Sequence, residues 1–297
     1  SLKNIFFIIY LYYNLSKGIK MKYVSNLHTH TIYCDGKNTV EENIQYAIDK
    51  KFISLGFSGH SHFYIDNTSM SEENTIKYLD DIKKAKDTYK NQIQIYLGIE
   101  GDYYSNLNKN TDKEMGLDYR IGSVHYIDDG NNSYFPIDMS RESFNNAVNY
   151  FGGIKEIIYR YYDNVINMIE TQKPDIIGHL DLIRKYNLNK EYFTENEDWY
   201  INKIYEVIDI IEKSGCIVEI NTKLMNKNNL DAHYPNKFTI KKILEKNIPI
   251  IINSDAHKTI NMDNYYTETI NELKKLGAES VKMLIDNEFK SIDINKL

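Results

Sequence analysis

Residues 248–255 read IPIIINSD, an isoleucine-rich run that ends in the polar residues Asn253, Ser254 and Asp255. A short strand with apolar side chains on both faces is typical of a buried parallel sheet. Other short apolar runs recur along the chain, and we expect each to be a strand of the same sheet. They lie at 22–26, 53–57, 93–100, 118–124, 175–179 and 216–221.

Helical patterns separate these runs, which predicts alternating strands and helices. Thr39 and Glu42 fit a capping box at the start of the first helix. Seven strands that alternate with helices predict an α/β fold, a (β/α) barrel of the TIM type with one strand fewer than the usual eight. An open doubly wound sheet is the alternative, but no glycine-rich phosphate loop follows the first strand. Helices are expected at 39–51, 71–89, 154–169, 197–213 and 237–246, and irregular loops over the site at 101–117 and 126–139.

Composition narrows the class of protein. The chain has 297 residues, 42% of them hydrophobic, and a formal net charge of -6. This charge excludes a general attraction to nucleic acid or to an anionic membrane, so neither is expected as a partner. Cys34 and Cys216 are too few for a disulfide framework, which favours a reduced compartment and a cytoplasmic location.

The first twenty residues do not fit the pattern of the rest. An apolar run from Ile5 to Tyr13 is too short to span a bilayer, and no small-x-small cleavage site follows it. We expect residues 1–20 to be an N-terminal extension and 21–297 to be one domain, because Met21 directly precedes the first strand. An export or membrane signal, or a hydrophobic element packed on the domain, are the alternatives.

Ionisable side chains gather at the carboxyl ends of the expected strands. In a barrel these ends meet at one mouth. Seven of the eight histidines fall there, and only His233 does not. His28 and His30 are two residues apart, so in an extended strand both rings point to the same side. The residues at these ends are His28, His30, Asp35, His60, His62, Glu100, His125, His179, Asp181, Glu219, Asn221, Asp255 and His257.

Neutral imidazoles and carboxylates packed together are standard ligands of divalent metals. A carboxylate such as Glu100 can bridge two ions, which together activate water for in-line displacement. Each residue also has a simpler interpretation: an isolated H-x-H is often incidental, and His179 could be a core histidine. Glu219 is expected to be a hydrogen-bonded barrel carboxylate, Asp181 a supporting residue, and His62 a substrate contact, a supporting residue or a surface residue. The predicted metal ligands are His28, His30, Asp35, His60, Glu100, His125, His179, Asp255 and His257.

Seven motifs, in this order, resemble the PHP (polymerase and histidinol phosphatase) superfamily, and most of all its monofunctional histidinol-phosphatase branch. They are HTHTIYCDG, GFSGHS, GIEGDY, IGSVHY, GHLDLIRKY, VEINT and INSDAH, and the match runs from about Met21 to about Leu284. The resemblance implies a distorted seven-stranded barrel and two or three ions of zinc, manganese or iron. The implied groups are His28, His30, Glu100 and Asp255; then Glu100, His125 and His179; then Asp35, His60 and His257.

The resemblance also implies an activity, the metal-dependent hydrolysis of L-histidinol phosphate in histidine biosynthesis. Glu100, Asp255 and His257 are then the expected catalytic residues. Arg160 and Arg184 are expected to grip the phosphate, although they could instead be surface residues paired with carboxylates.

The sequence also predicts contacts with the end of the substrate away from the phosphate, and it leaves several other functions open. His62 departs from the family pattern and is a candidate substrate contact. Polar and aromatic residues after the third and fourth strands are expected to meet the substrate's ammonium and imidazole. The rivals are hydrolysis of another small phosphomonoester (a nucleotide, phosphotyrosine or a sugar phosphate), an amidohydrolase and a non-catalytic metal-binding module. An amidohydrolase normally relies on a lysine at a strand end, and the sequence shows none there. The loop residues expected to meet the substrate's ammonium and imidazole are Asp102, Tyr103, Tyr104, Asp128 and Asp129.

Overall fold

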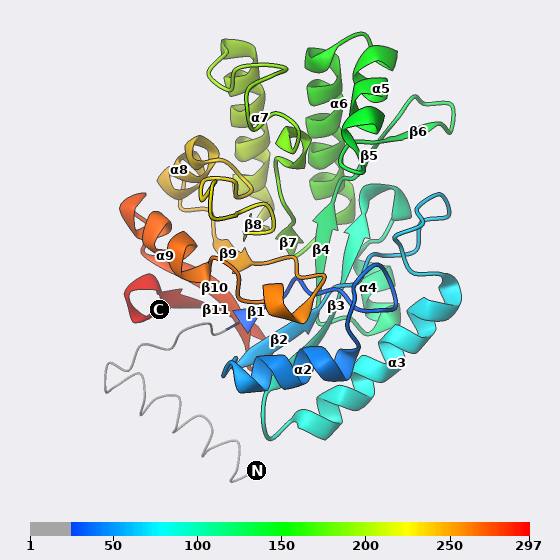
Figure 1. Cartoon of the computed structure of the whole chain (residues 1–297), viewed down its shortest axis with the longest axis vertical. Coiled ribbons are helices and arrows are strands. Elements are labelled where there is room, and N and C mark those ends of the chain that lie inside the picture. Colours follow the sequence, from blue (N-terminus) through cyan, green and yellow to red (C-terminus); the bar gives the residue numbers. More distant parts are fainter. Residues whose placement is uncertain (1–24) are drawn as a thin grey trace.

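Seven parallel strands form the centre of the molecule, with helices around them (Figure 1). The computed structural model describes residues 25–297, so the expected extension at 1–20 and the domain start near Met21 lie outside the described residues. Neighbours in the sheet follow the order of the chain, without the reversal of a doubly wound sheet, and the barrel prediction is confirmed. The strands are β1 (Ser25–Asn26), β2 (Ser54–Phe57), β3 (Gln94–Asp102), β4 (Tyr119–Ser123), β7 (Ile176–Ile177), β8 (Ile217–Asn221) and β9 (Ile250–Asn253).

The barrel is nearly closed between its first and last strands. The backbone amide of His30 donates to the carbonyl of Ala256, and the amide of Ala256 donates to the carbonyl of His28, both at 2.9 Å. Below them, Oδ1 of Asn253 accepts from the amide of Leu27 at 2.8 Å. These bonds fix the backbone on both sides of the H-x-H pair, so the seam of the barrel also positions the two imidazoles.

A tyrosine fills the barrel interior below the mouth. Tyr119 is 1% exposed, and its hydroxyl donates to the backbone carbonyls of Leu27 and Phe57. A Cβ atom built on Gly56 or Gly98 would lie 2.4 or 2.3 Å from the Tyr119 side chain, so both positions need glycine. The lower part of the barrel is therefore a packed core, which leaves the carboxyl ends of the strands for chemistry.

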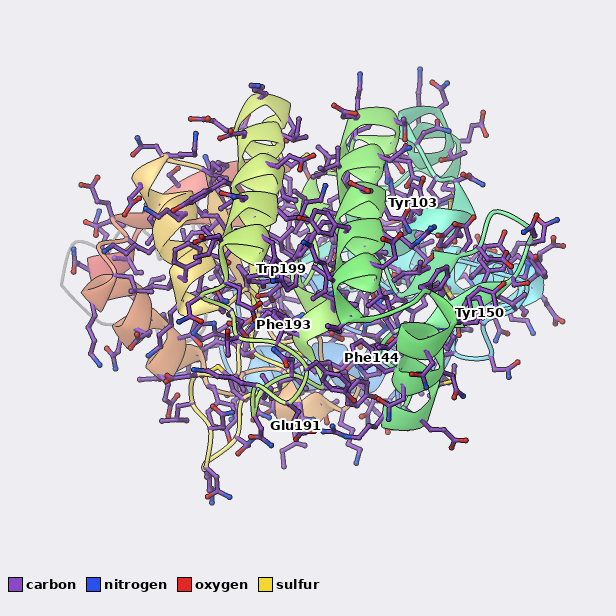
Figure 2. All side chains as sticks on the ribbon, turned by 90° about the horizontal axis from the view of Figure 1, so that it is seen from above. Tyr103, Phe144, Tyr150, Glu191, Phe193 and Trp199 are labelled. Carbon is purple, nitrogen blue, oxygen red and sulfur yellow. The ribbon has the colours of Figure 1, made fainter. Side chains whose placement is uncertain are left out.

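The predicted helices are present, and the Thr39–Glu42 capping box is confirmed by both of its hydrogen bonds, at 3.2 and 2.8 Å. Outside the barrel the core includes aromatic side chains: in Figure 2, Phe193 and Trp199 of α7 lie beside one another, with ring centroids 5.7 Å apart. No helix among residues 25–297 is long and apolar enough to cross a membrane. The helices are α2 (Val40–Asp49), α3 (Glu72–Tyr89), α4 (Lys109–Met115), α5 (Arg141–Tyr150), α6 (Ile154–Asn167), α7 (Asp198–Ser214), α8 (Lys237–Glu245) and α9 (Tyr266–Lys275).

The prediction of irregular loops at 101–117 and 126–139 is wrong. The first stretch continues β3, forms a 3-10 turn at Tyr103–Ser105 and then forms α4. The second forms a hairpin of β5 (Tyr126–Asp128) and β6 (Tyr134–Pro136). Helix α4 was not predicted because it buries only Asp112 and so has no apolar stripe. Strands β5 and β6 were not predicted because three residues are too few to show an alternating pattern. Three further elements were not predicted from the sequence: α5, α9 and the hairpin of β10 (Ser280–Ile285) and β11 (Glu288–Asp293).

Candidate metal centre

The structure brings all nine predicted metal ligands to the carboxyl end of the barrel. They come from several strands: His28 and His30 follow β1, Glu100 lies near the end of β3, and Asp255 follows β9. The imidazoles lie close together, and the rings of His30 and His257 stack at 4.0 Å between centroids. The cluster forms because parallel strands end at the same edge.

Glu100 lies at the centre of the cluster and is 1% exposed. Its two oxygens face different sets of imidazole nitrogens, which suits a carboxylate that bridges two ions. The distances from Oε2 are 3.0 Å to Nδ1 of His60, 3.1 Å to Nε2 of His28 and 3.5 Å to Nε2 of His30; those from Oε1 are 2.8 Å to Nε2 of His179 and 3.5 Å to Nε2 of His125.

Asp35 and Asp255 complete the outer side of the cluster. Oδ2 of Asp35 lies 2.9 Å from Nε2 of His257, and Oδ1 of Asp35 lies 3.8 Å from Nε2 of His60. Oδ1 of Asp255 lies 3.2 Å from Nε2 of His30 and 3.3 Å from Nδ1 of His257. Both carboxylates thus connect imidazoles that come from distant parts of the chain.

Among residues 25–297, three groups of ligand atoms each lie within 4.8 Å of one another. They resemble the three groups implied by the sequence motifs, but His30 and His60 each belong to two groups, and His179 belongs to none. The groups are His30, Asp35, His60 and His257; His28, His30 and Asp255; and His60, Glu100 and His125.

Buried polar atoms without a hydrogen-bond partner show that the cluster fits metal ions. Leaving such an atom unpaired costs about 1–3 kcal/mol, and more for a charged group. Several such atoms face one another in this cluster. Imidazole nitrogens and carboxylate oxygens are the ligand atoms that divalent transition metals bind. The unpartnered atoms of the predicted ligands are Nε2 of His28, Nε2 of His30, Oδ1 of Asp35, Oε2 of Glu100 and Nδ1 of His179.

The electrostatic field of the cluster also favours cations. Burial opposes protonation of His28, but the carboxylates of Glu219, Asp255 and Glu100 outweigh it and raise the pKa of His28 well above its ordinary value. Burial likewise opposes ionisation of Glu100, yet the neighbouring histidines hold its pKa well below the usual range. The carboxylates thus favour positive charge next to the imidazole nitrogens, which is the charge that a divalent ion would supply.

Two carboxylates orient imidazoles from behind. Glu219 contacts Nδ1 of His28, and Asp102 lies 3.1 Å from Nδ1 of His125. Burial opposes protonation of His125, but the hydrogen bond to Asp102 and the charge of Glu100 raise its pKa to about 10. This role of Asp102 was not predicted from the sequence. The spacing could have indicated it, because Asp102 lies two residues after Glu100 and so on the same face of β3.

A cavity of ≈310 Å³ opens over the cluster. That volume is at the lower end of the range of about 300–1,000 Å³ for small-molecule sites. None of the other charged residues that line the cavity was assigned a role from the sequence. The position of Lys223 could have indicated a place at the mouth, because Lys223 lies two residues after the carboxyl end of β8. Residues in the lining besides the cluster include Asp66, Thr68, Tyr126, Asp138, Lys185 and Lys223.

Lys223 corrects the statement that no lysine lies at a strand end. Its Nζ lies 3.1 Å from Oδ1 of Asp255 and 3.5 Å from Nε2 of His257. The ion pair with Asp255 requires a protonated ammonium, which a carbamylated lysine does not have. The contact therefore does not support an amidohydrolase.

The three predicted substrate-binding residues do not line this cavity. Arg184 is buried, with ion pairs to Asp181 at 2.8 Å and Glu195 at 2.7 Å. Arg160 pairs with its helix neighbour Glu156 at 2.9 Å, and its side chain is 43% exposed. Nδ1 of His62 lies 2.9 Å from the carbonyl of Met70.

The residues expected to meet the far end of the substrate also have other contacts. The Tyr104 hydroxyl accepts from the Asp128 amide at 3.0 Å and from the Asn164 side chain at 2.9 Å. Asp129 accepts from the Tyr150 hydroxyl at 2.9 Å. None of them lines the cavity, whose lining includes Asp66 and Tyr126.

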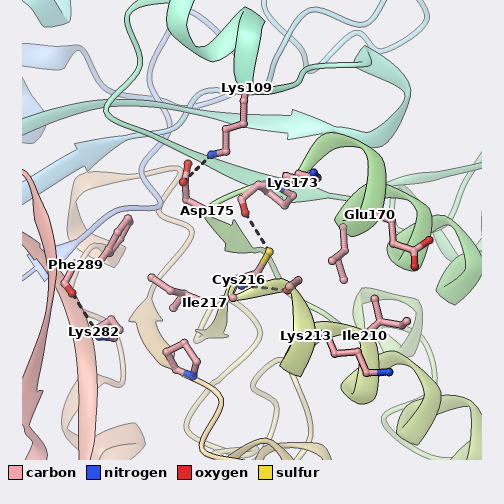
Figure 3. Close-up of a pocket in the computed structure, with 15 residues that line it drawn as sticks. Lys109, Glu170, Lys173, Asp175, Ile210, Lys213, Cys216, Ile217, Lys282 and Phe289 are labelled. Carbon is pink, nitrogen blue, oxygen red and sulfur yellow. Dashed lines mark hydrogen bonds and ion pairs between the residues drawn. The ribbon is translucent and has the colours of Figure 1, made fainter.

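A larger cavity of ≈710 Å³ lies at the opposite, amino-terminal end of the strands (Figure 3). Asp175 and Pro249 in its lining directly precede β7 and β9, and lysines surround it. The buried thiol of Cys216 donates to the carbonyl of Pro174 at 3.1 Å, and Lys109 pairs with Asp175 at 2.7 Å. The cavity contains none of the predicted ligands, so its size does not make it the metal site.

The fold and the cluster define a (β/α)-barrel protein with a histidine–carboxylate cluster that fits divalent metal ions. The family model described as the PHP domain matches residues 26–223, and the chain belongs to this family of metal-dependent phosphoesterases. The resemblance predicted from the seven motifs is confirmed.

Named relatives cover most of the chain. It is 27% identical to the "Probable histidinol-phosphatase" of Schizosaccharomyces pombe, over 86% of this chain and 88% of the relative. It is 25% identical to the histidinol-phosphatase of Bacillus subtilis, over 78% and 92%. The solved structure of histidinol phosphate phosphatase from Lactococcus lactis, complexed with zinc, L-histidinol and phosphate, superposes with a TM-score of 0.66. It is 16% identical and covers 90% of this chain and 98% of that one, which shows a shared fold.

Proposed function

We propose that this protein hydrolyses L-histidinol phosphate to L-histidinol and phosphate, a reaction of histidine biosynthesis. The observation that carries the proposal is the Glu100-centred cluster at the floor of a small cavity. The names of the relatives support it, since the Schizosaccharomyces pombe protein is named a probable histidinol-phosphatase and the Bacillus subtilis protein a histidinol-phosphatase, and both align over most of their length. The Lactococcus lactis protein, which has the same fold, binds zinc, L-histidinol and phosphate.

In this proposal the nine clustered residues hold two or three divalent ions, and zinc is the ion in the Lactococcus lactis relative. Bound metal would supply Lewis-acid stabilisation of the phosphoryl oxygens and a water of lowered pKa. Glu100, Asp255 and His257 would hold the ions at the reacting phosphate, and the contacts of Glu219 with His28 and of Asp102 with His125 orient these two rings.

Lysines rather than the predicted arginines supply the positive side chains of the cavity. Lys223 is 41% exposed and reaches the edge of the cluster through Asp255. Lys185 also lines the cavity, and its Nζ donates to the carbonyl of Asp138 at 2.5 Å. An ammonium group is a compact point charge that suits a phosphate oxygen. We therefore assign the phosphate contacts to Lys223 and Lys185.

Metal analysis of the purified protein combined with phosphate release from a panel of esters tests the proposal. The panel contains histidinol phosphate, an aryl phosphate, a nucleotide and phosphotyrosine. We expect kcat/KM for histidinol phosphate to exceed that for the aryl phosphate by at least ~10-fold, or ~1.4 kcal/mol. A nucleotide or phosphotyrosine that is the better substrate would overturn the assignment and leave the family membership intact.

A further inference from the structure

Asp66 differs from the other carboxylates in the lining of the cavity above the cluster. Asp35 and Asp255 contact the clustered imidazoles, and Oδ2 of Asp138 lies 3.4 Å from Nζ of Lys185. No lysine, arginine or histidine of residues 25–297 lies within ion-pair distance of Asp66. The cavity therefore contains one carboxylate whose charge the described part of the chain does not balance.

This carboxylate is held in place by neutral donors. Oδ1 of Asp66 accepts from the backbone amide of Thr68 at 2.8 Å and from its hydroxyl at 2.6 Å. Thr68 and Tyr126 both line the cavity beside Asp66. Burial and, after it, the charge of Asp66 raise the pKa of Tyr126, and Tyr126 directly follows His125, so Asp66 faces the wall that carries a predicted metal ligand.

The cavity thus offers opposite charges to the two ends of one small ligand. Lys223 and the metal cluster suit an anionic group, and Asp66 suits a cationic group. A phosphomonoester with an ammonium group near the ester oxygen carries this pair of charges. In histidinol phosphate the amine is on the carbon next to the CH₂–O–P group, so its charges are separated by a short, fixed distance.

We propose that Asp66, positioned by Thr68, binds the ammonium group of the substrate and makes the site selective for 2-aminoalkyl phosphates. This inference rests on the proposed phosphatase function and adds the residue that selects the substrate. Nucleotides, sugar phosphates and simple aryl phosphates lack this ammonium and would leave the carboxylate unpaired. A site with an unsatisfied polar group discriminates strongly against such analogues.

The test compares phosphoethanolamine, the smallest 2-aminoalkyl phosphate, with ethyl phosphate, which lacks the amine, and includes histidinol phosphate. The variant is Asp66→Asn, because the amide oxygen still accepts the two Thr68 hydrogen bonds and only the charge is lost. We expect kcat/KM to fall by ~10–100-fold for both amine-containing esters, as for the loss of a charged hydrogen bond. For ethyl phosphate the change should stay within ~3-fold.

Asp87→Asn on α3 is the matched control, because Asp87 is exposed and lies outside the cavity. Equal losses for phosphoethanolamine and ethyl phosphate in Asp66→Asn would overturn the proposal, and so would a wild-type protein without a preference between them. If the preference for phosphoethanolamine depends on Asp66 but histidinol phosphate is a poor substrate, this inference stands and the proposed function fails. If histidinol phosphate is the best substrate and Asp66→Asn leaves it unaffected, the proposed function stands and this inference fails.

Discussion

Oε1 of Glu219 lies 2.7 Å from Nδ1 of His28, and neither side chain is exposed to solvent. The contact directs the other ring nitrogen of His28 toward Glu100, 3.1 Å away. Glu219 is itself fixed by hydrogen bonds from the side chains of Asn221 and Asn253, both at 2.9 Å. A carboxylate excluded from the predicted ligands thus orients one of them, and its removal should be felt at the metal.

Glu219→Gln should therefore weaken metal binding although Glu219 is not itself a predicted ligand. Loss of such a supporting contact typically costs 10–100-fold in metal affinity or activity, and we expect a change of about that size. Titration of the metal-stripped protein with zinc measures the affinity. Glu142→Gln, at an exposed position of α5, is the control and should bind zinc like the wild type. Wild-type affinity in Glu219→Gln would show that His28 needs no orientation.

Glu100→Gln keeps the size of the side chain and removes the central negative charge of the cluster. We expect the loss of at least one metal equivalent and a fall in turnover of at least ~100-fold, because five imidazoles face this carboxylate. Metal content by elemental analysis and phosphate release are measured on the same preparation. Full metal content with near-normal turnover is the result that would refute the central role of Glu100.

Removal of metal should lower the stability of the fold. The cluster buries carboxylates and imidazoles, and an ion that binds only the folded state stabilises it by about 2.7 kcal/mol at a free concentration of 100 times Kd. Treatment with a chelator should therefore lower the Tm, and added zinc should restore it. A Tm that does not respond to chelator or zinc in the metal-stripped protein would argue against metal at this cluster.

Arg184→Met separates a structural role from a role in phosphate binding. The arginine side chain is 7% exposed and pairs with the fully buried Asp181, so its removal leaves a buried charge and should cost ~3–5 kcal/mol of unfolding free energy. Arg160→Met removes an exposed pair with Glu156 and should cost at most ~1 kcal/mol. Urea denaturation measures both. A stable Arg184→Met protein with a strongly raised KM would instead restore the predicted phosphate contact.

A chain that begins at Met21 is expected to fold and to turn over substrate like the full chain, because Met21 precedes the first strand. Circular dichroism, thermal unfolding and phosphate release compare the two. An insoluble or inactive shortened chain would place residues 1–20 within the fold and move the predicted domain boundary.

The sequence by itself determined the barrel and which histidines and carboxylates gather at its mouth. Strands buried on both faces must be apolar along their whole length, so runs such as 248–252 and 216–220 are visible without any tertiary information. Because parallel strands in a barrel end at one mouth, the polar residues that follow those runs had to converge there. His28, Glu100 and Asp255 could therefore be placed together although they lie far apart in the chain.

Only the tertiary structure decided which other side chains reach the cavity. Arg184 and Lys185 are neighbours in sequence, yet the first turns into an ion pair with Asp181 and the second lines the cavity. Asp66 reaches the same cavity from the segment after β2, and no periodicity marks it. Strand positions follow from hydrophobic burial that repeats along the chain, whereas the direction of a loop side chain depends on contacts with residues distant in sequence, such as Lys185 with Asp138.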